Sequence, residues 1–252
     1  MRKVAIFTDS TVDISKEMLD ERNIHMIPLF VHFGDEVFRD TIDITVEQLY
    51  EMVEKKGTLP STQATSPGEF LEYIKPYLDQ DYDIVFCGIG NKLSGTMKSV
   101  NIISGEYPNR IFPIDSMNLS SAEAILLFKA CDLRDEGKSA KEIQAIIQPQ
   151  AKYVISNFTI KGFEYLYKGG RATGLQATFG TALRVRPVLR TIDGELVLYK
   201  KPAGKFKKGM DVQIQDFLEQ YNKGNVDTKY VFITHSLNHK GFLYMKEQLE
   251  LN

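Results

Sequence analysis

The segment from Cys87 to Thr96 contains the residue types of an anion-binding turn. It follows an apolar run typical of a buried strand and precedes apolar residues at helical spacing. A turn of glycine and hydroxyl residues before a helix directs backbone N–H groups, the positive helix end and short donors at one place. Ser94, Gly95 and Thr96 are therefore candidate ligands for an anion. The alternative is that Ser94 only caps the helix and that Gly95 only relieves a tight turn.

Two further polar turns follow apolar runs that are typical of parallel strands. Asp9 and Ser10 come after the first run, and Asp115 and Ser116 after a later one. Because ligands in open parallel sheets lie beyond the carboxyl ends of the strands, these turns could face one crevice with the Cys87 segment. We expect these four residues to line or support a binding site. Turn formation and helix capping would explain Asp9 and Ser10 equally well.

A dense run of hydroxyl and amide groups precedes another predicted helix. Ser66 and Glu69 form a capping box there, with a proline at the first helical position. Thr62 and Gln63 are not needed for this cap, so they could contact a ligand instead.

A carboxylate is the anion that these groups suit. Thr62, Ser94 and the amides around Gly95 could hold it by charge-assisted hydrogen bonds without a buried cation. An apolar tail would need a tunnel, which the 15 Phe, 12 Tyr and 8 Met could line, although the same residues fill any core. The alternative is covalent catalysis by Ser94, but the Gly-x-Ser-x-Gly elbow is missing.

Composition excludes several classes of function. The chain has 252 residues with a formal net charge of -2, so we expect no general affinity for nucleic acid. It has no phosphate-binding loop and no Cys/His cluster for zinc, so we expect neither a metal nor a cofactor. Its two cysteines fit free thiols in a reducing cytoplasm, and no run is long and apolar enough for a signal peptide or a membrane span.

The elements that must position these residues alternate between strands and helices. Capping boxes over 45–48 and 139–142 mark the starts of two of the helices. Pro28 places the apolar segment around it on an edge strand or a crossing segment, and Asp193 with Gly194 predicts a hairpin turn. We predict strands over 4–7, 84–86, 111–114, 153–160 and 230–234, a hairpin over 188–198, and helices over 46–56, 67–78, 96–103, 122–130, 140–148, 163–168, 175–183, 211–221 and 240–249.

This order of elements predicts an α/β protein with two α/β domains. The first, residues 1–152, would hold a mostly parallel sheet flanked by helices and would carry the carboxylate-binding turns. The second, residues 153–252, would hold a smaller mixed sheet with helices. The boundary rests on a change of pattern near residue 152, because the chain contains no internal repeat and no low-complexity linker.

The ordered motifs resemble those of the DegV family of bacterial fatty-acid-binding proteins. The matching segments are Thr8–Asp13, Pro60–Pro67, Leu93–Thr96, Ile114–Ser116, Gly169–Arg171 and Arg186–Leu189. The resemblance implies that one long-chain fatty acid lies between the strand ends and the second domain, with its carboxylate held by Thr62 and Ser94. It also implies a non-enzymatic carrier that presents this carboxylate to a separate fatty-acid kinase for acyl-phosphate formation and phospholipid synthesis. Arg171 and the lysines over 200–208 would suit contact with that kinase.

The sequence departs from the family pattern in two places. The threonine loop usually reads Thr-Ser-Gln-Pro-Ser, whereas Thr62 is followed here by Gln-Ala-Thr-Ser. The family's later Gly-x-His-x-Gly-Pro-Gly segment, whose histidine joins the carboxylate network, does not occur in this sequence. Either His235 or His239 substitutes, or the site lacks that donor, or the chain is a shortened form. A hydrolase or transferase that uses Ser94, and a regulatory module for another small carboxylate, are the alternative functions.

Overall fold

The computed structural model describes residues 2–171 and 186–251, which form two compact units. The first unit runs to Val154 and includes Asp193–Glu195, and the second comprises Ile155–Ile192 and the residues from Leu196 onwards. The domain boundary predicted at residue 152 stays a prediction, and the helix predicted over 175–183 lies outside the described residues. Within those residues, no helix is both long enough and apolar enough to cross a bilayer.

A four-stranded parallel sheet is the centre of the first unit. Its strands lie in the order β2 (Ile24–Ile27), β1 (Lys3–Asp9), β6 (Tyr82–Gly88) and β7 (Ile111–Asp115), and every neighbouring pair is parallel. The three predicted parallel strands are confirmed. The segment around Pro28 divides at that proline, because β2 ends before it as an edge strand and the following residues join another sheet.

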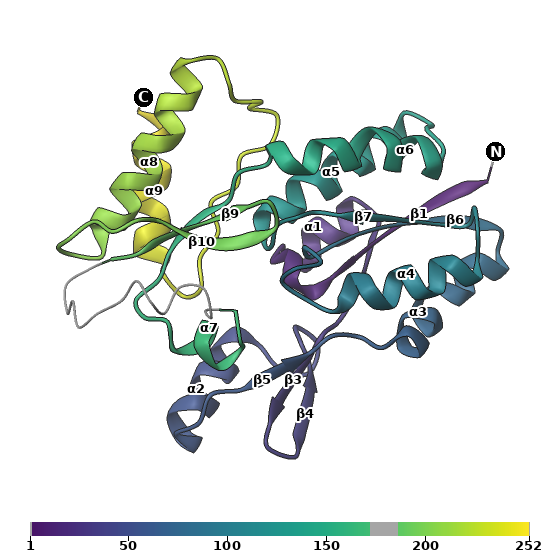
Figure 1. Ribbon diagram of the computed structural model, residues 1–252, viewed down its shortest axis with the longest axis horizontal. Helices are drawn as coiled ribbons and strands as arrows, with labels where there is room; N and C mark the ends of the chain where they lie inside the picture. Colours follow the sequence, from purple (N-terminus) through teal and green to yellow (C-terminus); the bar gives the residue numbers. More distant parts are fainter. Residues whose placement is uncertain (1, 172–185, 252) are drawn as a thin grey trace. The chain divides into compact units, whose positions relative to one another are not determined.

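Helices cover both faces of this sheet (Figure 1). On one face, α3 (Pro67–Asp79) and α4 (Thr96–Glu106) pack their buried residues against alternate residues of the inner strands. On the other, α5 (Ser121–Asp135) and α6 (Ala140–Ile147) contact β1, β6 and β7. The short helix α1 (Lys16–Glu21) packs against β2. A parallel sheet covered on both faces explains why its strands read as continuous apolar runs.

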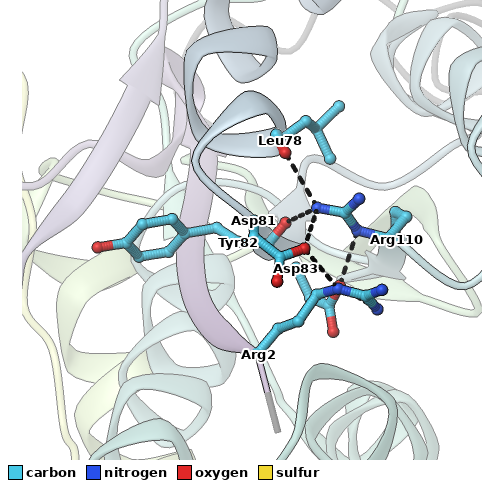
Figure 2. Close-up of polar contacts among 6 residues, drawn as sticks. All are labelled: Arg2, Leu78, Asp81, Tyr82, Asp83 and Arg110. Atoms are coloured by element: carbon cyan, nitrogen blue, oxygen red, sulfur yellow. Dashed lines mark hydrogen bonds and ion pairs between the residues drawn. The ribbon is translucent and has the colours of Figure 1, made fainter.

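The amino ends of β1 and β6 are held together by an ion-pair cluster (Figure 2). Arg110 donates through Nη2 to the carbonyl oxygen of Leu78 at 3.1 Å and to that of the first residue of β6 at 2.8 Å. Its Nε donates to Asp83 at 3.1 Å, and Arg2 donates to Asp81 at 2.7 Å. At this end of the sheet, the charges of the two arginines and the two aspartates therefore neutralise one another.

A small antiparallel sheet also belongs to the first unit. Its order is β4 (Glu36–Arg39), β3 (Phe30–Phe33) and β5 (Ser61–Gln63), and the apolar residues of β3 pack against α2 (Val46–Lys56). The helix was predicted from its capping box, whereas β4 and β5 were not predicted. The three predicted capping boxes, which pair Thr45 with Gln48, Ser66 with Glu69 and Ser139 with Glu142, are all present.

The second unit contains a three-stranded sheet and three described helices. The sheet order is β10 (Glu195–Lys200), β9 (Val188–Ile192) and β8 (Asn157–Thr159), and the helices are α7 (Glu164–Lys168), α8 (Lys207–Asn222) and α9 (His239–Glu250). The predicted hairpin is confirmed, with Asp193 and Gly194 both at positive φ, as a two-residue turn of this kind requires.

The strand predicted over 230–234 is wrong. The structure leaves this segment irregular, and the described sheet of the second unit consists of β8, β9 and β10. The predicted strand over 153–160 is shorter than expected, because a 3-10 helix from Gln148 to Tyr153 precedes β8. Apolar and β-branched residues favour a strand, but a strand forms only where another strand offers its backbone groups.

Candidate functional site

The turn after β6 is fixed by the turns after both neighbouring strands. The Ile89 N–H donates to Asp9 Oδ2 at 3.1 Å on the β1 side. On the β7 side the Asn91 N–H donates to Asp115 Oδ1 at 3.3 Å. The Gly90 N–H also donates to the carbonyl oxygen of a residue that follows β7, at 2.8 Å. The carboxyl ends of the three strands therefore form one connected edge, and its middle turn leads to Ser94.

Asp9 and Ser10 support this edge from inside the protein. Both side chains are buried, and Asp9 also accepts hydrogen bonds from the N–H and the hydroxyl of Thr11. Ser10 Oγ donates to Asp40 at 2.7 Å and accepts from the Leu29 N–H at 3.1 Å. Burial raises the pKa of Asp9, and the hydrogen bonds that it accepts oppose that shift. These contacts are those of turn formation, and through Ile89 they also fix the start of the turn after β6.

Asp115 and Ser116 have the same supporting role on the other side. Asp115 Oδ1 also accepts from the Met117 N–H at 2.8 Å, while Gln148 contacts the backbone of Asp115 through both ends of its amide, at 2.9 and 3.0 Å. Ser116 is buried, and its Oγ donates to the carbonyl oxygen of Asn118 at 3.1 Å. The contacts of Asp115 and Ser116, like those of Asp9 and Ser10, hold the turns in place, and a part of these residues in binding stays a prediction.

Ser94 lies just before the first turn of α4 and is only partly buried. Its Oγ accepts from the Thr96 N–H at 3.3 Å and lies 3.0 Å from Thr96 Oγ1. The N-cap residue is Gly95, which has no side chain, so the Ser94 hydroxyl is the side chain that meets the first N–H of the helix. The first turn of α4 also contains no acidic residue, so the positive end of the helix dipole is not neutralised within it.

Neither the backbone nor the surrounding packing requires a glycine at position 95. Gly95 has φ -74° and ψ -7°, which any residue adopts easily. A Cβ there would make only an ordinary contact, 3.7 Å from the Cβ of Ala64. Relief of a tight turn is therefore the wrong explanation of this glycine. Glycine also allows a ligand to come close to the backbone, and the structure does not contradict that role for Gly95.

The threonine loop lies beside the Ser94 turn, because Ala64 approaches Gly95. Thr62 and Gln63 are exposed residues of β5, paired with Val31 and Phe30 of β3. Among the described residues, the Thr62 hydroxyl makes no hydrogen bond, so it keeps both its donor and its acceptor capacity. Thr62 and Ser94, both among the described residues, make no hydrogen bond with each other. The fold thus brings the two segments together at Ala64 and Gly95.

The remaining candidates belong to the second unit. Arg171 is exposed and its guanidinium donates to the carbonyl oxygen of Gly169. His235 Nδ1 accepts from the Asn238 N–H at 3.2 Å, and the His235 ring lies against that of His239. Among residues 2–171 and 186–251, no three metal-ligating side chains are grouped for a metal ion.

Sequence reasoning missed Glu123, the buried partner of the residues at the turn after β1. Glu123, on α5, is fully buried and accepts from the Thr8 hydroxyl at 2.8 Å, while its second oxygen lies 3.3 Å from Thr11 Oγ1. One signal was available, because Glu123 interrupts the apolar residues of a predicted buried helix between Ala122 and Ala124. A charged residue within such a pattern needs a polar partner.

Known proteins match this chain over most of its length. The family model described as "Uncharacterised protein, DegV family" matches residues 3–251. A DegV domain-containing protein of Clostridium perfringens is 30% identical over 253 residues, covering 100% of this chain and 89% of the relative.

Solved structures share the fold. DegV of Bacillus subtilis, described as a fatty acid binding protein, is 27% identical with a TM-score of 0.85, covering 100% of this chain and 89% of that one. The fatty acid kinase B3 protein of Streptococcus pneumoniae, loaded with linoleic acid, is 24% identical with a TM-score of 0.72, covering 86% and 78%. On the family match and the C. perfringens relative, the chain belongs to the DegV family.

Proposed function

We propose that this protein binds a long-chain fatty acid, holds its carboxylate at the start of α4, and presents it to a separate fatty-acid kinase. The observation that carries the proposal is the start of α4 beside Ser94, where the N-cap residue is a glycine and the first turn holds no acidic residue, in a chain of the DegV family. The B. subtilis relative is described as a fatty acid binding protein, which supports this choice of ligand.

The chemistry of the Ser94 turn suits a carboxylate. A helix N-terminus attracts negative charge, and hydrogen bonds from hydroxyl and amide donors to an anion are stronger than those to a neutral group. Ser94 and Thr96 provide hydroxyl groups beside Gly95, and the loop that carries Thr62 approaches Gly95 through Ala64. Lys98, in the first turn of α4, is exposed and adds a positive charge, so it does not neutralise the positive end of the helix dipole.

The contacts of Ser94 favour a carrier over a hydrolase. A nucleophilic serine needs a base within hydrogen-bond reach. The Ser94 oxygen instead contacts the hydroxyl and the N–H of Thr96, neither of which is a base at neutral pH. If Thr96 Oγ1 donates to Ser94 Oγ, the Ser94 hydrogen is available to a bound anion, which supports binding over catalysis.

Mass spectrometry of the purified protein tests the binding step. Under native conditions we expect a mass increase that matches one fatty acid, and under denaturing conditions we expect release of the acid without covalent attachment. Absence of any lipid, together with no uptake of added C14 to C18 acids, would contradict the proposal. Labelling of Ser94 by a phosphonate probe, lost in Ser94→Ala, would instead indicate the hydrolase.

A reconstituted phosphoryl transfer tests the presentation step. The loaded protein is mixed with a bacterial fatty-acid kinase and ATP, and acyl phosphate is trapped as a hydroxamate. We expect hydroxamate to form only when the protein, the kinase and ATP are all present. Arg171→Ala should slow its formation without weakening binding of the acid. Tight binding without any acyl phosphate would indicate the regulatory module instead.

A further inference from the structure

A chain of hydrogen bonds connects a buried carboxyl on α5 to the turn that leads to Ser94. Glu123 Oε1 accepts from the Thr8 hydroxyl at 2.8 Å, and its Oε2 lies 3.3 Å from Thr11 Oγ1. Thr11 Oγ1 is also within hydrogen-bond distance of Asp9 Oδ1. Asp9 Oδ2 in turn accepts from the Ile89 N–H, at the start of the β6 turn.

Counting hydrogens indicates that the hydrogen bonds joining Glu123, Thr11 and Asp9 need one more proton than two ionised carboxylates would leave there. A threonine hydroxyl carries one hydrogen, so Thr11 can donate to only one of the two carboxyl oxygens beside it. If both acids were ionised, the other contact would bring two lone pairs together in a buried place. A proton on either carboxyl group removes this conflict, because the hydroxyl then accepts from one acid and donates to the other.

The donors around each acid decide which one carries the proton. Asp9 accepts from the Thr11 N–H, the Thr11 hydroxyl and the Ile89 N–H, and three such donors favour the ionised form. Glu123 is fully buried. Because Thr11 donates to Asp9, the Thr8 hydroxyl is the remaining donor to Glu123. Burial raises the pKa of Glu123 well above its ordinary range, and the charge of Asp9 adds to that rise.

We propose that Glu123 is a neutral acid at physiological pH, and that its proton, passed as a hydrogen bond through Thr11, fixes the Asp9 carboxylate that positions the turn before Ser94. Glu123 is then a positioning residue for the anion site. Its effect on ligand binding rests on the proposed function, whereas its protonation does not.

The other groups that face Glu123 do not supply a counter-charge. The strand residues nearby are Thr8 on β1 and Cys87 on β6, whose thiol is buried and has a strongly raised pKa. Thr11 and Asp13 come from the segment after β1, and Asp13 adds a negative charge that also raises the pKa of Glu123. No cation acts on Glu123 from these elements within the described residues.

Infrared spectroscopy tests the protonation directly. The spectrum of wild type at pH 7 minus that of Glu123→Gln should contain the carbonyl band of a protonated carboxylic acid. Glutamine keeps one donor and one acceptor in the same place, so this variant is expected to fold. A difference spectrum with only the bands of a carboxylate would overturn the proposal, and neither result depends on a fatty acid.

The pH dependence of stability gives a second test. The folded state would keep the proton on Glu123, while the unfolded chain releases it near the ordinary value of 4.5. Because the folded state then binds more protons, the stability of wild type should fall relative to Glu123→Gln as pH rises from 5 to 8. A neutral Glu123 and a glutamine both leave Asp9 without an added charge beside it, so the titration of Asp9 should contribute similarly to the two proteins. Parallel stability curves over that range would overturn the proposal.

Substitutions of Thr11 test the positioning role. Thr11→Val keeps the shape but removes the hydroxyl, so we expect at least a tenfold loss of fatty-acid affinity in protein that still unfolds cooperatively. Thr11→Ser keeps the hydroxyl and should restore affinity to within threefold of wild type. Equal affinities of the valine variant and wild type would contradict positioning. If wild type binds no fatty acid, the proposed function fails, and the infrared result still decides the protonation.

Discussion

Two helices of the same unit, α3 and α4, start in opposite ways. Both pack against one hydrophobic core, which contains Phe70 of α3 and Met97 of α4. At the start of α3, Ser66 Oγ accepts from the Glu69 N–H and the Glu69 carboxylate accepts from the Ser66 N–H. At the start of α4, Gly95 occupies the N-cap position, the first turn holds no acid, and the side-chain contact is the 3.3 Å hydrogen bond from the Thr96 N–H to Ser94 Oγ.

The difference separates a helix start that completes the fold from one that is open to a ligand. In α3 the capping box satisfies the first N–H groups and its carboxylate meets the helix dipole. In α4 the corresponding N3 position holds Lys98 instead of an acid. A bound carboxylate would supply what Glu69 supplies to α3. Substitutions at matched positions should therefore affect stability in one helix and ligand affinity in the other.

The largest effect is expected from Ser94→Ala. Removing a hydroxyl donor to a bound carboxylate should weaken fatty-acid affinity by about 1.5–3 kcal/mol. The free energy of unfolding without ligand should change little, because Ser94 is partly exposed and its hydrogen bond from the Thr96 N–H is long, at 3.3 Å. Fluorescent fatty-acid titration and urea unfolding measure the two quantities. Unchanged affinity would place the carboxylate elsewhere.

Gly95→Ala should separate affinity from stability in a second way. The added methyl group would occupy the space of the carboxylate, at a cost in affinity of about 1–3 kcal/mol, as for overpacking of a fitted site. Stability should stay within about 1 kcal/mol, because the backbone conformation suits alanine. Gly68→Ala, in the first turn of α3 where a Cβ meets nothing within 4 Å, is the matched control. Wild-type affinity in Gly95→Ala would refute a role for this backbone.

Ser66→Ala is the counterpart of Ser94→Ala on the closed helix. Loss of the N-cap hydroxyl should lower the free energy of unfolding by about 0.5–2 kcal/mol. Fatty-acid affinity should remain that of wild type, since the Ser66 hydroxyl already contacts Glu69. The same titration and urea experiments test this. A loss of affinity as large as that of Ser94→Ala would remove the distinction between the two helix starts.

Lys98→Glu should produce the smallest effect. It places an acid where α3 has Glu69, so the helix start should gain stability and lose carboxylate affinity, each by about 0.3–1 kcal/mol. Both changes should shrink at high salt because Lys98 is exposed. Lys98→Gln, which only removes charge, should fall between wild type and the glutamate variant. Tighter binding by Lys98→Glu would contradict the open-helix interpretation.

Sequence reasoning found the features that depend on neighbouring residues. The capping boxes at Thr45, Ser66 and Ser139 and the hairpin turn at Asp193 use contacts within a few residues, so their patterns predicted them correctly. The parallel strands also followed from their apolar runs. These signals are local, and tertiary packing did not override them.

The failures concern pairing between distant segments. The segment over 230–234 has the composition of a strand but forms none, while the polar strand β5 was missed because its pairing with β3 is decided by the fold. The role of Glu123 depends on Thr8, 115 residues away in the chain. Composition gives no account of such partners.

The sequence by itself determined the strand-turn-helix units, the caps of α3 and α6, and the hydroxyl and glycine residues of the Ser94 turn. Tertiary structure decided how these parts act on one another. It placed Asp9 and Asp115 on either side of the β6 turn, brought Ala64 to Gly95, and joined Glu123 to Asp9 through Thr11. The physical reason is that a cap is a contact within one turn of chain, whereas these contacts form only when separate strands and helices pack together.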